Sequence, residues 1–156
     1  MSRELQKMLY TTAAMTFEEL AFVFPTPEMD QQQQTARLDA SVSVQFSGPI
    51  NGRLVVKVYG NLLPTIAANM LGQEEAPCSS QQYDALGEIG NVICGNILPK
   101  IAGAKAVFHL SPPQIIADVQ SDHIQSPAAE AQIGLEGGRA CLLLFLDGEA
   151  QFKEKR

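Results

Sequence analysis

Two polar side chains on a predicted helix, Glu88 and Asn91, have the types and spacing to act on another molecule. At about 100° per residue, Asp84, Glu88, Asn91 and Gly95 fall on one side of this helix, separated by four, three and four positions. The carboxylate of Glu88 can pair with a cation, and the neutral amide of Asn91 can both donate and accept hydrogen bonds. From the pattern alone a solvated helix surface is the simpler interpretation, because E-x-x-N is a common tetrapeptide.

The opposite side of the same helix is apolar and must face a core. Three glycines also lie in this helix, although each costs about 1 kcal/mol relative to alanine in a helix interior. Gly90 falls on the apolar side, where it would allow close approach of a sheet or helix, and Gly95 falls on the polar ridge, where a partner's backbone could come near. The third glycine is Gly87. Pure packing is the alternative explanation for all three glycines. The apolar residues are Leu86, Ile89, Ile93, Cys94, Ile97 and Ile101.

The remaining elements follow from hydrophobic periodicity and from turn residues. Ser79 and Gln82 match a capping box at the start of the ridge helix, and Gly103 is expected to end it. The polar stretch 28–34, with four glutamines, is expected to be a solvated loop without core residues. Helices are predicted over 2–23 and 62–71, and strands over 36–46, 54–59, 107–110, 114–119, 129–135 and 140–146.

This order predicts an α+β fold in a single domain, residues 1–156, because the strands come in hairpins rather than alternating with helices. A mainly antiparallel sheet would pack against two long helices and a shorter one. The segment 52–56 resembles the segment 138–142, and a long helix precedes each hairpin. The fold is therefore expected to contain a pseudo-repeat of helix plus hairpin.

Composition excludes several classes of function. Seventeen acidic and eleven basic residues give a net charge of −6, which argues against a nucleic-acid partner because such partners need clustered Lys and Arg. No apolar run reaches the roughly 18 residues of a membrane span, and the N-terminus does not read as a signal peptide. The three cysteines, Cys78, Cys94 and Cys141, are expected to be reduced and mostly buried. A cytoplasmic protein is expected.

Motifs for independent catalysis are missing from the sequence. His109 and His123 have no second ligand at metal-binding spacing, so no metal site is expected. The sequence contains no G-x-S-x-G elbow, no phosphate-binding P-loop and no dinucleotide-binding fingerprint. An enzyme acting alone on a small molecule is therefore disfavoured.

The string Asp84-x-x-x-Glu88-x-x-Asn91, continued by Val92-Ile93-Cys94-Gly95-Asn96, resembles the signature helix of the CheC/CheX/FliY chemotaxis phosphatases. The order of helices and hairpins extends this resemblance over nearly the whole chain. Pro112 and Pro113 come one or two positions earlier than the family pattern places its proline. CheC-type relatives carry a second E-x-x-N, but the residues three positions after Glu18 and Glu19 are not asparagine. The chain is therefore similar to CheX-like members, with one site each.

The resemblance implies hydrolysis of the aspartyl phosphate of a CheY-like response regulator. Asn91 would orient the attacking water, and Glu88 would pair with the regulator's active-site lysine. Asp84 is expected to support the start of the helix, and both Asp84 and Gly95 are assigned to partner binding or support. The resemblance also implies a homodimer without a cofactor of its own, with Mg²⁺ supplied by the regulator. The alternative is a non-catalytic chemotaxis or flagellar-switch adaptor of the same fold that docks a regulator.

Overall fold

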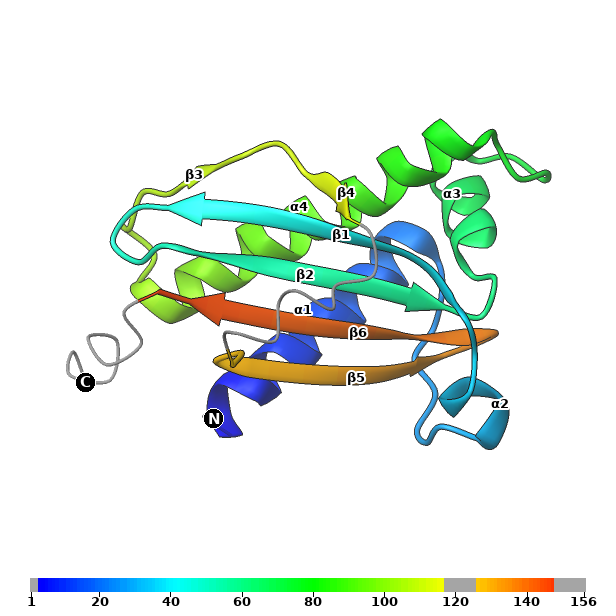
Figure 1. Cartoon of the computed structure of the whole chain (residues 1–156), viewed down its shortest axis with the longest axis horizontal. Helices are drawn as coiled ribbons and strands as arrows, with labels where there is room; N and C mark the ends of the chain where they lie inside the picture. Colours follow the sequence, from blue (N-terminus) through cyan, green and yellow to red (C-terminus); the bar gives the residue numbers. More distant parts are fainter. Residues whose placement is uncertain (1–2, 117–125, 148–156) are drawn as a thin grey trace.

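The computed structural model describes residues 3–116 and 126–147, which form one antiparallel sheet with helices packed on one face. Figure 1 shows the two long helices, α1 and α4, lying side by side behind the sheet. The helices are α1 (Arg3–Ala21), α2 (Gln31–Gln34), α3 (Leu63–Leu71) and α4 (Ser79–Ala102). The strands are β1 (Leu38–Ser47), β2 (Gly52–Tyr59), β3 (His109–Leu110), β4 (Gln114–Ile116), β5 (Ala129–Leu135) and β6 (Gly138–Leu146).

The strand order β3-β1-β2-β6-β5, with β4 also paired to β1, confirms the predicted α+β class and the antiparallel sheet. Two long helices and one shorter helix are present as expected, and the single turn α2 is added to them. His123 and the end of the predicted strand 114–119 lie outside the described residues. Within the described ranges, none of the helices has the length and apolar character that crossing a membrane requires.

Two hairpins meet at the centre of the sheet, where β2 pairs with β6. The arginine near the start of each of these strands stacks on an aromatic ring of the other strand. The Arg53 guanidinium lies 4.4 Å from the ring centre of Phe145, and that of Arg139 lies 3.6 Å from the ring centre of Tyr59. Each long helix contacts the hairpin that does not follow it directly in the sequence. The helix α1, which precedes the first hairpin, contacts β5 of the second, and α4, which precedes the second hairpin, contacts β1 of the first. The two hairpins are therefore joined into one sheet, and the pseudo-repeat of helix plus hairpin stays a prediction.

The apolar face of α4 packs against the sheet as the sequence predicts. Leu86, Ile89, Ile93 and Ile97 are fully buried, and the partly buried Ile101 packs at the edge of the same core. Burying side chains of this size contributes about 1.5–3 kcal/mol each. This packing fixes the rotation of α4 about its own axis.

The predicted capping box at the start of α4 is wrong. The N-cap residue is Cys78, and its side chain makes no capping hydrogen bond. The Gln82 side chain instead donates to the carbonyl of Pro77, 2.9 Å away. The first helix also ends two positions earlier than predicted, at Ala21, where Phe22 adopts a positive φ of 54°.

The prediction that 28–34 contains no core residue is also wrong. Asp30 and Gln33 form a capping box around the single turn α2, and Gln33 is buried. The Gln33 amide donates to the carbonyl of Leu135 at 2.8 Å and to that of Gly138 at 3.2 Å. Because buried carbonyls need hydrogen-bond donors, Gln33 ties this connection to the turn between β5 and β6.

The cysteines are mostly buried, as expected: Cys94 and Cys141 are buried, and Cys78 is exposed. Two hydrogen bonds lower the pKa of Cys78. The larger effect comes from the Ser80 hydroxyl, and the next from the backbone of Gln81. Burial raises the pKa of Cys94 to about 12. Burial and the charge of Glu130 raise the pKa of Cys141 to about 11.

We therefore expect Cys78 alone to react with iodoacetamide in the folded protein, because the thiolate is the reactive form. The rate of alkylation of Cys78 should reach its plateau at a lower pH than the rate for an ordinary thiol, because the pKa of Cys78 is lowered. Mass spectrometry of peptides labelled at several pH values measures this. Modification of Cys94 or Cys141 at a comparable rate without denaturant would contradict the assignment.

Candidate functional site

The polar ridge of α4 faces outward as predicted. Asp84, Glu88 and Gly95 are exposed, and Asn91 is half-buried. Within the described part of the chain, no hydrogen bond or ion pair engages the side chains of Asp84, Glu88 or Asn91. Their polar groups are thus available to another molecule.

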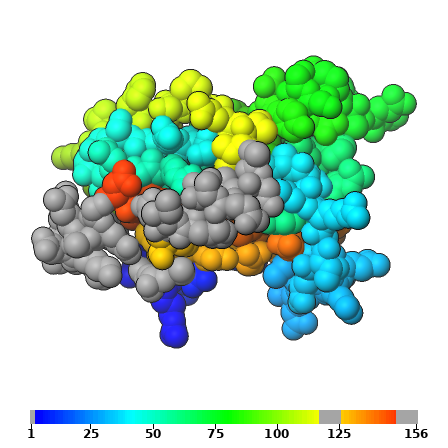
Figure 2. All heavy atoms as spheres, viewed as in Figure 1, coloured from blue at the N-terminus to red at the C-terminus, as the bar shows by residue number. Residues whose placement is uncertain are grey.

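A hollow of about 230 Å³ lies beside this ridge. Its walls come from α4, from β1 and from the segment that includes β4, so three separate parts of the sequence build it. Figure 2 shows the yellow segment around β4 meeting the green start of α4 at the surface. The lining residues are Val42, Tyr83, Asp84, Gly87, Glu88, Asn91, Pro113 and Ile115.

The sequence does not identify Val42, Tyr83 or Ile115 as part of the site. Val42 and Ile115 are paired across β1 and β4, and this pairing of distant segments leaves no local signal in the sequence. The hydrophobicity of Tyr83 and Ile115 alone does not distinguish them from core residues.

Gly87 explains the position of Pro113. A Cβ atom added at Gly87 would lie 3.2 Å from the Pro113 Cβ, a tight contact. The missing side chain therefore lets the proline lie directly on α4. Pro113 is one of the two prolines that come one or two positions earlier than the family pattern places its proline, and it lines the same hollow as Glu88 and Asn91.

Gly90 provides the close approach that the sequence predicts. A Cβ atom there would lie 3.1 Å from Cγ2 of Val44 and 3.3 Å from Cγ1 of Val42, both on β1. Because interiors are densely packed, the missing side chain lets α4 lie closer to β1 than a larger residue would allow. A Cβ at Gly95, by contrast, would meet no atom of the described residues within 4 Å.

Asp84 does not support the start of α4, so that prediction is wrong. The first turn of the helix contains no acidic residue, and the favourable effect of an anion on the helix dipole fades beyond the first turn. Asp84 lies one turn before Glu88 and lines the same hollow. Two carboxylates at this spacing repel each other, so the pair favours a cationic group of a partner.

The ridge offers an amide and two carboxylates but no hydroxyl, thiol or amine nucleophile. In the described ranges, no three His, Cys, Asp or Glu side chains gather in a way that could hold a metal ion. The arrangement can bind a cation and orient a small polar molecule such as water through Asn91.

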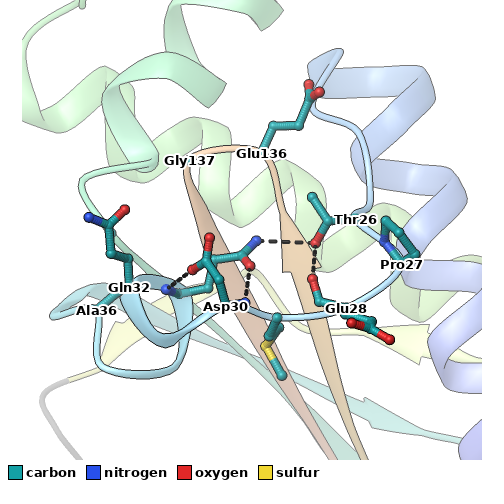
Figure 3. A pocket seen from close by; sticks show the side chains of 11 residues that line it. Thr26, Pro27, Glu28, Asp30, Gln32, Ala36, Glu136 and Gly137 are labelled. Atoms are coloured by element: carbon teal, nitrogen blue, oxygen red, sulfur yellow. Dashed lines mark hydrogen bonds between the residues drawn. The ribbon is translucent and has the colours of Figure 1, made fainter.

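A larger hollow of about 770 Å³ lies elsewhere, between the connection after α1 and the turn between β5 and β6 (Figure 3). Several of its polar groups are hydrogen-bonded to one another. The Thr26 hydroxyl accepts from the Gln33 amide at 3.1 Å and donates to the carbonyl of Glu28 at 2.9 Å. This hollow contains no ridge residue, and nothing in it suggests chemistry.

Comparison with known proteins gives a family model that matches most of the chain. The family model described as chemotaxis phosphatase CheX matches residues 40–145, a range that includes the whole ridge. No curated protein matches the sequence at a significant level.

Solved structures share the fold at low sequence identity. A chemotaxis protein CheX from Desulfovibrio desulfuricans is 20% identical with a TM-score of 0.70, and the match covers 92% of this chain and 99% of that chain. The CheX-CheY-BeF3-Mg²⁺ complex from Borrelia burgdorferi contains a chain that is 14% identical with a TM-score of 0.61, covering 90% of this chain and 96% of that one. FliY from Thermotoga maritima is 18% identical with a TM-score of 0.60, covering 99% and 96%.

Two of the three glycines of α4, Gly90 and Gly95, make a matched pair for testing the packing. Gly95→Ala should raise the free energy of unfolding by about 0.5–1 kcal/mol, because it removes the cost of glycine in a helix. Gly90→Ala should gain less, because its new Cβ presses on Val42 and Val44. Urea denaturation measures both. Equal stabilisation by the two substitutions would contradict the close approach at Gly90.

Proposed function

The chain belongs to the chemotaxis phosphatase CheX family, and from this premise we propose that it hydrolyses the aspartyl phosphate of a CheY-like response regulator. Asn91 orients the attacking water, and Glu88 pairs with the regulator's active-site lysine. The observation that carries the proposal is the position of Asn91, half-buried beside the hollow with its amide not engaged by the described residues. The related chain seen with CheY in the Borrelia complex supports this choice of partner.

Hydrolysis of an acyl phosphate suits such a sparse site. The water oxygen bonds to phosphorus while the bond from phosphorus to the aspartyl oxygen breaks. The carboxylate leaves with the electron pair, and the water's proton passes to the phosphate product or solvent. A reactive bond of this kind needs no nucleophile from the phosphatase, only a water held in line with phosphorus. A neutral amide orients that water by donating and accepting hydrogen bonds, as the glutamine of GTPases does.

Glu88 supplies the electrostatic part of the contact. It projects from the same ridge as Asn91, three residues earlier, so it can pair with a lysine close to the phosphorylated aspartate. Such a pair fixes the register of two proteins. Asp84 adds negative charge to this side of the hollow, and Gly95 leaves room for a partner's backbone further along the ridge.

The chain requires no cofactor of its own in this proposal, since Mg²⁺ would be held by the regulator. We also propose a cytoplasmic homodimer, as the family resemblance implies. The geometry at Asn91 depends on none of these features.

The first test replaces the amide. Asn91→Ala should reduce acceleration of regulator dephosphorylation by at least about 100-fold, towards the regulator's intrinsic rate, because water orientation is lost. Decay of the phosphorylated regulator, followed by loss of radiolabel, measures the effect. Asn96→Ala is the matched control, since Asn96 is exposed on the same helix and outside the hollow. Full activity of Asn91→Ala would contradict the mechanism.

The second test reverses the charge beside the amide. Glu88→Lys should raise KM for the phosphorylated regulator by about tenfold or more, because it places a like charge opposite the partner's lysine. Glu136→Lys makes the same change of net charge at an exposed position in the turn between β5 and β6. Equal effects of the two substitutions would mean that net charge, and not a pair at Glu88, governs association.

A further inference from the structure

Two large apolar side chains are exposed in the wall of the ridge hollow. Tyr83 on α4 is 41% exposed, and Ile115 on β4 is 42% exposed. Both line the same hollow as Glu88 and Asn91. Single exposed apolar residues are ordinary on protein surfaces, but these two come from separate segments and meet at the proposed site.

The structure holds the Ile115 side of the hollow firmly. Ile115 pairs with Val42 across β1 and β4, and two residues earlier Pro113 lies directly on Gly87. Tyr83 is carried by a helix whose opposite face is buried. A preformed surface loses little conformational freedom when a partner covers it, so these side chains suit a docking role.

The position of Asn91 determines what must cover them. Asn91 also lines the hollow, and its amide must come within hydrogen-bond distance of a water at the partner's phosphorus. A regulator that approaches this closely covers the hollow and removes Tyr83 and Ile115 from water. Burial of apolar surface favours association.

The distribution of charge in the hollow identifies the chemistry of the matching surface. Asp84 and Glu88 supply two negative charges, while Val42, Pro113 and Ile115 make the apolar part. A complementary surface therefore places an aliphatic or aromatic side chain in the hollow and a basic group beside it.

We propose that Tyr83 and Ile115 are the residues that set affinity for the phosphorylated regulator, by enclosing an apolar side chain that the regulator carries next to its phosphorylation site. This inference rests on the proposed function and extends it. The two residues determine which regulator docks, whereas Asn91 acts on the bound phosphate. Tyrosine is among the residues that dominate interface energetics when buried.

The test uses the full chain and a CheY-like receiver protein from the same organism, activated with beryllofluoride and Mg²⁺. Tyr83→Ser and Ile115→Ser should each raise Kd by about tenfold, measured by calorimetry. In the decay assay, both should raise KM with kcat changed less than about twofold. Thermal unfolding verifies that the variants fold.

Matched controls are available in the same chain. Tyr10 is 38% exposed on α1, and Val107 is 83% exposed on the segment that follows α4. Neither lines the ridge hollow. Tyr10→Ser and Val107→Ser should leave Kd and KM unchanged.

The outcomes separate this inference from the proposed function. If Tyr83→Ser and Ile115→Ser bind as the wild type does while Asn91→Ala loses activity, the docking role is overturned and the phosphatase proposal stands. If the wild type binds the activated receiver and these variants do not, but Asn91→Ala retains full activity, docking is supported and the mechanism fails. If the wild type does not bind the activated receiver, the docking role is overturned.

Discussion

The packing of α4 against β1 is the contact on which the rest of the site depends. A helix with one apolar side has a single rotation that buries it, and Gly90 allows that side to approach Val42 and Val44 closely. Once this rotation is set, the residues on the opposite side must face outward. The exposure of Glu88 and the half-exposure of Asn91 therefore follow from the burial of Ile89 and Ile93, and not from any interaction of their own.

The second constraint comes from the chain that follows α4. Pairing of β4 with β1 brings Pro113 onto Gly87 and Ile115 to the rim of the hollow. The ridge alone would be a flat polar surface, whereas the returning chain gives it a wall. This combination places an acidic side and an apolar side next to the same amide, which is the arrangement expected of a surface that receives another protein.

The sequence predicts the fold class and the ridge because both follow from the local periodicity of apolar residues. The polar positions opposite a run of isoleucines predict which side of the helix faces outward, whereas the choice of Glu88 and Asn91 as site residues comes from the family resemblance. The burial of Gln33 is not predicted, because its hydrogen-bond partners, Leu135 and Gly138, lie about a hundred residues away in the sequence. Without these partners, a tract of glutamines is interpreted as solvated. The position of Ile115 is not predicted for the same reason, since only the pairing with β1 shows where it lies. Ser79 and Gln82 form a local capping pattern, but the N-cap residue of α4 is Cys78, and its side chain makes no capping hydrogen bond.

Turnover is the most direct measure of whether Asn91 orients water or the ridge only docks a regulator. The protein is mixed with a large molar excess of phosphorylated regulator, and inorganic phosphate release is followed until it ends. The account predicts that each copy releases many equivalents of phosphate at a rate proportional to its concentration. Phosphate release at the regulator's intrinsic rate, together with formation of a stoichiometric complex, would contradict it and would instead fit an adaptor that docks without catalysis.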